Sequence, residues 1–285
     1  MEVFFKGLWI GGTMTVPGVS GGTMAILVGI YDRLIGAVSG LVPKKRSVGD
    51  KENQERSYWS VARISLLFLL VFLLGAGLGI LFFAKVISGI LEQPVAGGYL
   101  RFFFLGAVAG GIPFIWSSAK VKKFSPWLIL LPVVGAGLVY GLTFLPEEMF
   151  SLEAAGGIGA FLLKLVGGII LAVALVLPGV SASQMLYTLG IYEELLTCIS
   201  DFRVVPLIPL GIGTVFGILL ITKALDMLMS KYPTQTFLII FGFILGSLPE
   251  LFPQNAEGNY LLCGVCVAVG FLLAYWIGKR EREKA

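Results

Sequence analysis

The chain has 285 residues, of which 57% are hydrophobic and 13% are charged, and its formal net charge is +4. This is more apolar side chain than one soluble core can bury, so the composition indicates an integral membrane protein and excludes a soluble globular one. The modest positive charge gives no sign of nucleic-acid binding. The three cysteines include one CxxC stretch, Cys263–Cys266, but it lies in an apolar span and has no second pair or histidine to complete a metal site, so we expect neither a metal nor a cofactor.

The chain begins with two apolar segments that are each too short to span a bilayer. The first covers residues 3–16, whereas a spanning helix needs about 20 residues. The sequence PGVSGG then begins at Pro17, and the apolar run after it soon meets Asp32 and Arg33. Two short helices joined by a glycine-rich tip predict a re-entrant hairpin, at about residues 3–33, that enters and leaves by one face.

Six full spans are predicted from the remaining long apolar stretches. They cover residues 64–91, 99–118, 126–145, 204–229, 234–252 and 259–278. Between the third and the fourth, the stretch 158–177 runs into a second break, PGVSAS, which begins at Pro178. We interpret residues 158–195 as a second re-entrant hairpin, although its first arm is long enough to span the bilayer by itself.

The loop charges agree with this layout. If both termini are cytoplasmic, most loop lysines and arginines fall in cytoplasmic segments, at 44–63, 120–123, Lys231 and 279–284. The opposite loops are rich in glutamate, for example at Glu147. Cytoplasmic loops of multi-pass proteins carry an excess of lysine and arginine, and reading either hairpin as two full spans would send basic loops outside. We therefore expect a multi-pass protein with both termini in the cytoplasm.

The two halves of the chain resemble each other. PGVSGGTMAILVGIYDRL, at Pro17–Leu34, matches PGVSASQMLYTLGIYEEL, at Pro178–Leu195, with nine identities in eighteen positions. Two further matches follow in the same order: GILFFAK (79–85) with GILLITK (217–223), and GAVAGGIP (106–113) with GFILGSLP (242–249). Because each half contains three spans, an odd number, the second half should be upside down relative to the first.

The expected fold is therefore an all-α integral membrane protein with an inverted-topology repeat. Residues 1–150 form the first repeat and residues 151–285 the second, and each repeat has one re-entrant helical hairpin and three transmembrane helices.

The two tips are the predicted anion site. The second arm of each hairpin should begin near the bilayer midplane with unpaired backbone N–H groups and a partial positive charge, which attract anions. Glycines let the backbone approach a ligand, and hydroxyl or amide side chains suit phosphate oxygens. The candidate phosphate ligands are Gly18, Ser20, Gly21, Gly22, Thr23, Gly179, Ser181, Ser183 and Gln184. The alternative is that these small residues only permit tight helix packing in lipid.

Charged residues at repeated positions add further candidates. Lys85 and Lys223 occupy the same repeat position inside long apolar helices, where they would bind phosphate or else extend toward the lipid headgroups. Asp32 and Glu193 follow the tips in GIYD and GIYE, and they could pair with a lysine, carry coupling protons or cap a helix. Arg33 has no basic counterpart in the second repeat, so its role as an ion-pair residue is less defined.

The paired tips PGVSGGTMA and LPGVSASQM, their GIYD and GIYE continuations and the repeat organisation resemble the bacterial polyprenyl-phosphate transporter family, the undecaprenyl-phosphate translocases, over essentially the whole chain. The resemblance implies a transporter in the bacterial cytoplasmic membrane that returns undecaprenyl phosphate, the lipid carrier of cell-wall sugars, from the outer to the inner leaflet for cell-envelope synthesis. Its partners would be this or a related polyprenyl phosphate and membrane lipids. The oligomeric state, including a homo-oligomer, is left open.

Several mechanisms fit these features. In the alternating-access hypothesis, the two halves rock around a headgroup held at the tips while the isoprenoid tail stays in lipid. A channel or carrier for a small soluble anion is the alternative, because the same helix ends would bind it. A third possibility is a scaffold for protein assembly that transports nothing, but this function would leave the repeated tips unexplained. An intramembrane hydrolase is not expected, because such an enzyme usually needs a histidine as nucleophile or base.

Overall fold

A computed structural model describes residues 1–42, 51–119, 121, 125–142, 144, 157–201, 203, 205–253 and 258–284. At 51–58, 193, 196, 199, 200 and 284 only the backbone is described. These residues form helices and their connections, with no β-strand among them, which confirms the prediction of an all-helical protein.

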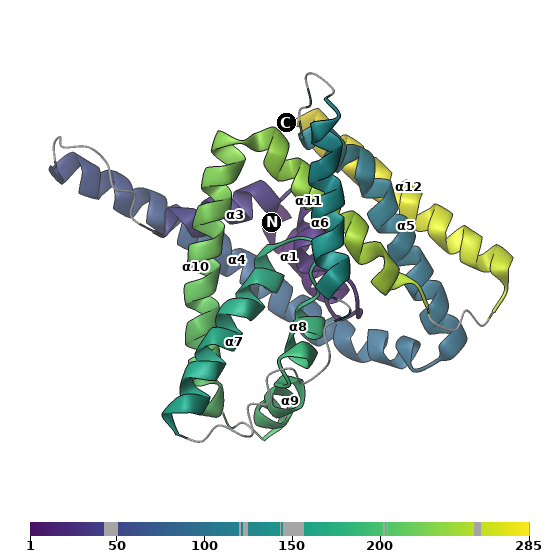
Figure 1. Cartoon of the computed structure of the whole chain (residues 1–285), viewed down its shortest axis with the longest axis horizontal. Helices are drawn as coiled ribbons and strands as arrows, with labels where there is room; N and C mark the ends of the chain where they lie inside the picture. The colour runs from purple at the N-terminus through teal and green to yellow at the C-terminus, as the bar shows by residue number, and fades with distance from the viewer. Residues whose placement is uncertain are drawn as a thin grey trace.

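Figure 1 labels the helices in chain order, except for the short α2. Their bounds are α1 Glu2–Thr13, α2 Gly21–Leu27, α3 Tyr31–Gly40, α4 Lys51–Leu91, α5 Pro94–Ser118, α6 Trp127–Leu142, α7 Ile158–Val176, α8 Ala182–Thr188, α9 Tyr192–Ser200, α10 Ile208–Lys231, α11 Pro233–Leu251 and α12 Tyr260–Lys284. A short 3-10 turn, Val205–Leu207, precedes α10.

Six helices in the described part of the chain are long and apolar enough to cross a membrane: α4, α5, α7, α10, α11 and α12. Their number matches the prediction, but the set does not. The described α6 has 16 residues and is shorter than a span, whereas α7, the predicted first arm of the second hairpin, has 19 and qualifies. Helix length alone therefore does not distinguish a hairpin arm from a full span, because an arm that enters the membrane deeply can have as many residues as a short transmembrane helix.

Four close helix pairs build the structure: α1 with α4, α7 with α10, α5 with α12, and α6 with α11. Contact between α5 and α11 joins two of these pairs into a group of four helices, α5, α6, α11 and α12, called here the four-helix group. On the other side, α3 contacts both α4 and α10 and so connects the remaining two pairs. Helices α1, α3, α4, α7 and α10 are called here the hairpin group.

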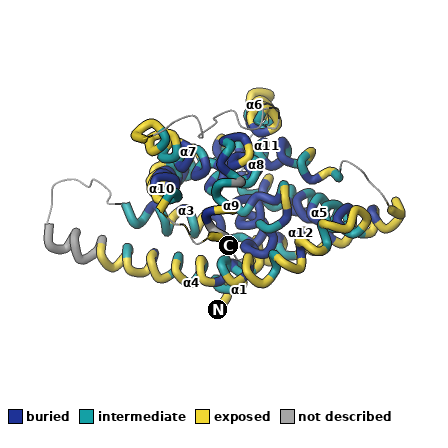
Figure 2. The backbone as a smooth tube through the Cα atoms, turned by 90° about the horizontal axis from the view of Figure 1, so that it is seen from below, coloured by how far each residue is buried: buried dark blue, intermediate teal, exposed yellow. Residues whose placement is uncertain are grey.

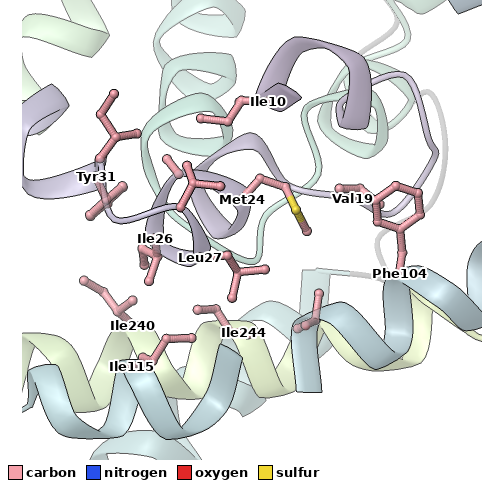
Figure 3. Close-up of a cluster of buried hydrophobic side chains, with 14 of the residues drawn as sticks. Ile10, Val19, Met24, Ile26, Leu27, Tyr31, Phe104, Ile115, Ile240 and Ile244 are labelled. Carbon is pink, nitrogen blue, oxygen red and sulfur yellow. The ribbon is translucent and has the colours of Figure 1, made fainter. Parts of the chain in front are cut away.

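The short helix α2 lies between these two groups. Its side chains Met24, Ile26 and Leu27 are buried in the main apolar cluster together with Ile115 of α5 and Ile244 of α11 (Figure 3). In lipid such side chains are held mainly by van der Waals contact, because the hydrocarbon is as apolar as the core. The cluster therefore stabilises the position of α2 and of the break that precedes it.

The outer surfaces of the long helices are apolar and exposed. Helix α4 lies along one edge of the molecule, with exposed residues over most of the length for which side chains are described (Figure 2). These include Leu67, Leu70, Leu73, Leu81 and Phe82. A continuous apolar face of this kind is suited to lipid rather than to water, in agreement with a multi-pass membrane protein.

Small residues allow the paired helices to approach closely. In the α5–α12 pair, a Cβ atom added to Gly270 would overlap the carbonyl oxygen of Phe103, and one added to Gly106 would overlap that of Val267. Van der Waals packing of this kind drives helix association in lipid, where apolar side chains gain nothing by leaving the hydrocarbon.

Replacing Gly270 by alanine should therefore lower the stability of the α5–α12 pair by about 1–3 kcal/mol, because the backbones must separate to fit the new methyl group. The control is Gly264→Ala in the same helix, where an added Cβ meets nothing within 4 Å. This control should be neutral or slightly stabilising, since alanine is the better helix former. Thermal unfolding of both variants in detergent measures the difference, and equal melting temperatures would contradict the packing role of Gly270.

Candidate functional site: two broken helices whose tips meet

Both predicted tips are breaks in helical structure with the same backbone geometry. The first break separates α1 from α2, and the second separates α7 from α8. Gly18 has φ of 83° in the first and Gly179 has φ of 82° in the second. This left-handed region is costly for residues with a Cβ atom, which explains why PGV precedes the serine in both copies. Ser20 and Ser181 then adopt matching extended conformations at the starts of α2 and α8.

The two tips contact each other directly. The Gly179 N–H donates a hydrogen bond of 2.9 Å to Thr23 Oγ1, and both residues are buried. Next to this bond, a Cβ atom on Gly22 would lie 3.0 Å from the backbone of Pro178. The Tyr31 hydroxyl adds a second link by donating to the carbonyl oxygen of Val176 at 2.9 Å. Segments that are far apart in the sequence thus form one buried polar junction.

The junction packs against α11. Gly179 lies against the backbone of Phe243, in the middle of this candidate span, and Gly18 lies against Glu250 and Leu251 at its end. Seven residues of α-helix separate these levels by about 10 Å. The second tip is therefore level with the middle of a helix that is long enough to cross the membrane.

The serines that begin α2 and α8 differ in their hydrogen bonding. Ser181 Oγ accepts from the Gln184 N–H at 3.4 Å and caps α8. Ser20 occupies the same position before α2 but makes no side-chain cap bond. Ser20 is only 5% exposed, and its Oγ atom is buried without a hydrogen-bond partner within the described part of the chain. A buried hydroxyl left unpaired costs about 1–3 kcal/mol.

The remaining predicted tip ligands lie around this junction. Gly18, Gly21, Ser183 and Gln184 are half-buried, while Gly22, Thr23, Gly179 and Ser181 are buried. Gly21 lies against the Met14 side chain, where an added Cβ would be 2.7 Å from the sulfur atom. The structure therefore gathers the predicted tip residues of both halves, but it packs them tightly against protein.

The predicted lysines differ from the tip residues in their exposure. Lys85 on α4 and Lys223 on α10 are both exposed, whereas the tip junction is buried. Asp32 and Arg33 begin α3, are exposed and line a cavity beyond the other end of α2. Arg33 also lies over the ring of Phe68, 5.0 Å from its centre. The side chain of Glu193 lies outside the described residues.

That cavity has a volume of about 740 Å³ and includes charged residues that the sequence did not single out as ligands. They are Glu2 and Lys6 of α1, Asp226 of α10, and Glu281 and Arg282 of α12. Asp226 accepts a hydrogen bond of 2.8 Å from the Ser39 hydroxyl. A carboxylate within a candidate membrane span is itself a signal of function, and its place in α10 could have identified Asp226 from the sequence.

Comparison with known proteins gives a consistent result. The family model described as undecaprenyl phosphate translocase-like matches residues 10–262. The chain is 30% identical to a polyprenyl-phosphate transporter of Vibrio cholerae, over 89% of this chain and 78% of that protein. It is 27% identical to a polyprenyl-phosphate transporter of Staphylococcus aureus, over 98% of this chain and 96% of that protein. No solved structure matches the chain significantly.

The bond between the tips makes a direct prediction about stability. Thr23→Val removes the acceptor for the buried Gly179 N–H and should lower the free energy of unfolding by about 1–3 kcal/mol, because the amide is left unpaired. Thr23→Ser keeps the hydroxyl and should retain most of the stability. Thermal unfolding of the two variants in detergent provides the measurement. A loss in Thr23→Ser with none in Thr23→Val would mean that the methyl group of Thr23, rather than its hydroxyl, stabilises the junction.

Proposed function

Because the chain belongs to the undecaprenyl phosphate translocase-like family, we propose that it carries undecaprenyl phosphate or a related polyprenyl phosphate across the bacterial cytoplasmic membrane. The observation that supports a headgroup site most directly is the meeting of the two broken helices at the Thr23–Gly179 hydrogen bond. The alternative ligand, a small soluble anion, would use the same helix ends.

The proposed topology is an inverted repeat with two re-entrant hairpins. Helices α2 and α8 each have seven residues, and their first residues, Gly21 and Ala182, occupy matching positions in the two repeated sequences. Gly29 and Gly190, which end the matching turns, have φ of 65° and 66°. If α1–α6 of the first half are matched with α7–α12 of the second, the pair α1–α4 corresponds to α7–α10. The pair α5–α12 corresponds to α11–α6. This exchange of partners between halves is expected if one half is inverted relative to the other.

In the proposed site, the phosphate binds at the junction, and Ser20 is its first ligand. The Ser20 hydroxyl is a buried donor with no partner in the described residues, so a phosphate oxygen could satisfy it without displacing a protein bond. Thr23, Ser181, Ser183 and Gln184 surround the two helix starts and would complete the site after a small separation of the tips. A hydrogen bond to a charged group contributes about 1.5–3 kcal/mol, so several could offset part of the cost of removing phosphate from water.

We propose that transport proceeds from the outer to the cytoplasmic leaflet by alternating access. The hairpin group and the four-helix group are each held by close helix pairs, and α2 and the tips lie between them. Two bodies of this kind can rock around a site at their boundary, which exposes the headgroup to one side at a time. The isoprenoid tail would remain against the exposed apolar faces of the long helices.

Lys85 and Lys223 are proposed as ligands outside the junction. Both are exposed on long apolar helices, so each could contact a phosphate headgroup at the protein–lipid boundary before or after it reaches the tips. If Lys85→Ala and Lys223→Ala both leave headgroup binding and leaflet exchange unchanged in reconstituted vesicles, neither lysine is a ligand, and their role is confined to the lipid interface.

Ser20→Ala should weaken the binding of undecaprenyl phosphate by about ten- to a hundredfold, because one hydrogen bond to a charged group is lost. Its thermal stability should not decrease, since Ser20 Oγ has no protein bond to lose. The matched control is Thr236→Val, which removes a buried hydroxyl that donates to the Tyr232 carbonyl oxygen at 2.8 Å near the start of α11. The control should affect stability but not affinity.

Binding of the purified protein to undecaprenyl phosphate, undecaprenyl diphosphate and inorganic phosphate decides between the two ligand classes. A preference for the lipid phosphates, with leaflet exchange in vesicles, supports the proposal. Equal affinity for inorganic phosphate, with uptake of the free ion, would favour the soluble-anion carrier. Unchanged lipid affinity in Ser20→Ala would remove Ser20 from the site.

A further inference from the structure

The charged cavity lies at the boundary between the hairpin group and the four-helix group. One wall comes from α1, α3 and α10, and the other from α5, α11 and α12, with Ile26 of α2 between them. The cavity walls hold four carboxylates, Glu2, Asp32, Asp226 and Glu281, and three cations, Lys6, Arg33 and Arg282. Because the carboxylates outnumber the cations, the cavity is not suited to hold an anionic headgroup, and its ion pairs call for a structural explanation.

Several of these charged groups bind within one helix group. The Ser39–Asp226 hydrogen bond joins α3 to α10, both in the hairpin group. The Arg282 guanidinium donates to the Pro113 carbonyl oxygen at 3.2 Å and joins α12 to α5, both in the four-helix group. These two contacts can persist if the groups move as bodies.

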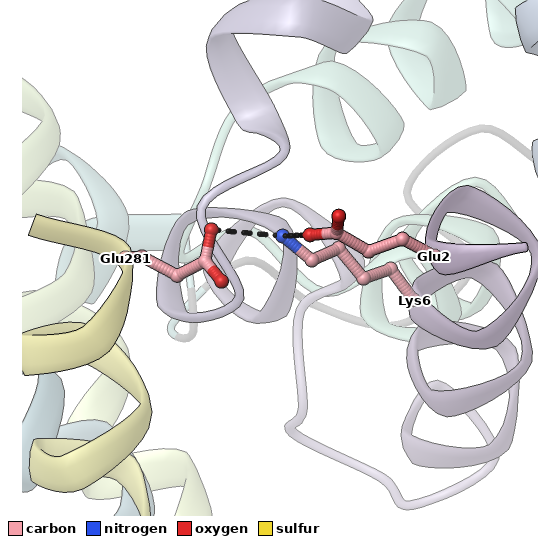
Figure 4. Close-up of polar contacts among 3 residues, drawn as sticks. All are labelled: Glu2, Lys6 and Glu281. Carbon is pink, nitrogen blue, oxygen red and sulfur yellow. Dashed lines mark hydrogen bonds and ion pairs between the residues drawn. The ribbon is translucent and has the colours of Figure 1, made fainter. Parts of the chain in front are cut away.

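The Lys6–Glu281 ion pair instead crosses the boundary (Figure 4). Lys6 Nζ lies 2.9 Å from Glu281 Oε2, and the side chains are only 16% and 15% exposed. The pair joins α1, the first arm of the first hairpin, to α12, near the opposite end of the chain. Limited exposure reduces screening by water and salt, so this pair should contribute more than a typical surface ion pair.

Glu281 also lies against the corner of the first hairpin. A Cβ atom on Gly29 would be 2.9 Å from Glu281 Oε2 and 3.0 Å from its Cβ and Cγ atoms. Gly29 has φ of 65° at the turn between α2 and α3, a conformation and a close approach that both favour glycine. The carboxylate therefore contacts both the first arm of the hairpin and the turn that follows its second arm.

We propose that the Lys6–Glu281 pair is a latch between the hairpin group and the four-helix group on the side of the molecule where α1 begins and α12 ends. When the pair is formed, α12 is held against the first hairpin and the two walls of the cavity are kept close together. When it breaks, the groups separate and water enters. The role of this opening in lipid transport rests on the proposed function, whereas the latch itself concerns only the two helix groups.

The repeat provides an internal contrast. The second hairpin has its own ion pair, Lys164 with Glu194, but this pair joins α7 to α9, which belong to the same predicted hairpin. Sequence position 6 is lysine in the first half, whereas its counterpart in the second half is Gly167. The latch therefore has no equivalent at the matching position. It would bias an otherwise symmetric pair of conformations toward the one that is closed on the α1 side.

Thiol labelling tests the latch without any lipid substrate. Ser117→Cys places a reporter on α5 in the cavity wall, and the rate of its reaction with a membrane-impermeant maleimide measures its exposure. Labelling of the parent chain, which has three native cysteines, provides the blank. Glu281→Gln should raise the reporter's labelling rate by more than about fivefold, because that is the population change expected for a surface ion pair and this pair is less screened.

Glu2→Gln is the matched control. Glu2 also lies 2.9 Å from Lys6 Nζ, but the two residues are one turn apart in α1, and the Glu2 side chain is 58% exposed. Removing this carboxylate from the same lysine should leave labelling unchanged. Equal rates in all three proteins, or an equal increase in both variants, would overturn the latch. Gel filtration and melting temperature establish that each variant is folded.

A covalent lock provides the converse test. Lys6→Cys with Glu281→Cys, joined by a short reducible thiol crosslinker, should stop leaflet exchange of undecaprenyl phosphate in vesicles, and reduction should restore it. Exchange that continues at the parent rate after complete crosslinking would overturn the latch while leaving the proposed function intact. If the parent chain exchanges no lipid at all but Glu281→Gln still raises labelling, the latch stands and the proposed function fails.

Discussion

A helix that breaks inside a bilayer leaves backbone N–H and C=O groups that no water can satisfy, so the protein must supply their partners. This chain breaks two helices, and the Thr23 hydroxyl in one half satisfies the Gly179 amide in the other. The Tyr31–Val176 hydrogen bond adds a second link between the halves. The second break therefore depends on the first half: Thr23 and Tyr31 satisfy backbone groups beside the second tip, and separating the halves would leave these buried groups unpaired.

The same junction also has a difference between its two halves that bears on function. Ser181 caps its helix, whereas the equivalent Ser20 is buried with an unpaired hydroxyl in the described structure. The backbones match closely, so this difference comes from side-chain surroundings rather than from the fold. An unsatisfied group of this kind is unfavourable in a purely structural junction, but it is useful where a ligand must bind. Together with the meeting of the two tips, it is a reason to propose a phosphate site there.

The charged residues are distributed to suit motion between bodies. Asp226 and Arg282 bond within their own helix groups, while Lys6 and Glu281 meet across the boundary beside the cavity. Apolar side chains of α2 remain packed between the groups and can act as the contact around which they turn. In the proposed mechanism, the tips bind the headgroup and the Lys6–Glu281 pair controls the separation of the two helix groups.

The sequence by itself determined the membrane class, the positions of the two breaks and the family resemblance, because long apolar runs, proline and glycine act locally and recur in both halves. It also identified the tip residues as a set. Only the tertiary structure decided that Thr23 bonds Gly179, that Ser20 differs from Ser181, and that Lys85 and Lys223 are exposed whereas the tip junction is buried. It likewise brought together Lys6 and Glu281, whose separation in the chain conceals their pairing. The physical reason is that helix breaks follow from local backbone sterics, whereas the direction of a side chain and the identity of its partner depend on how distant helices pack.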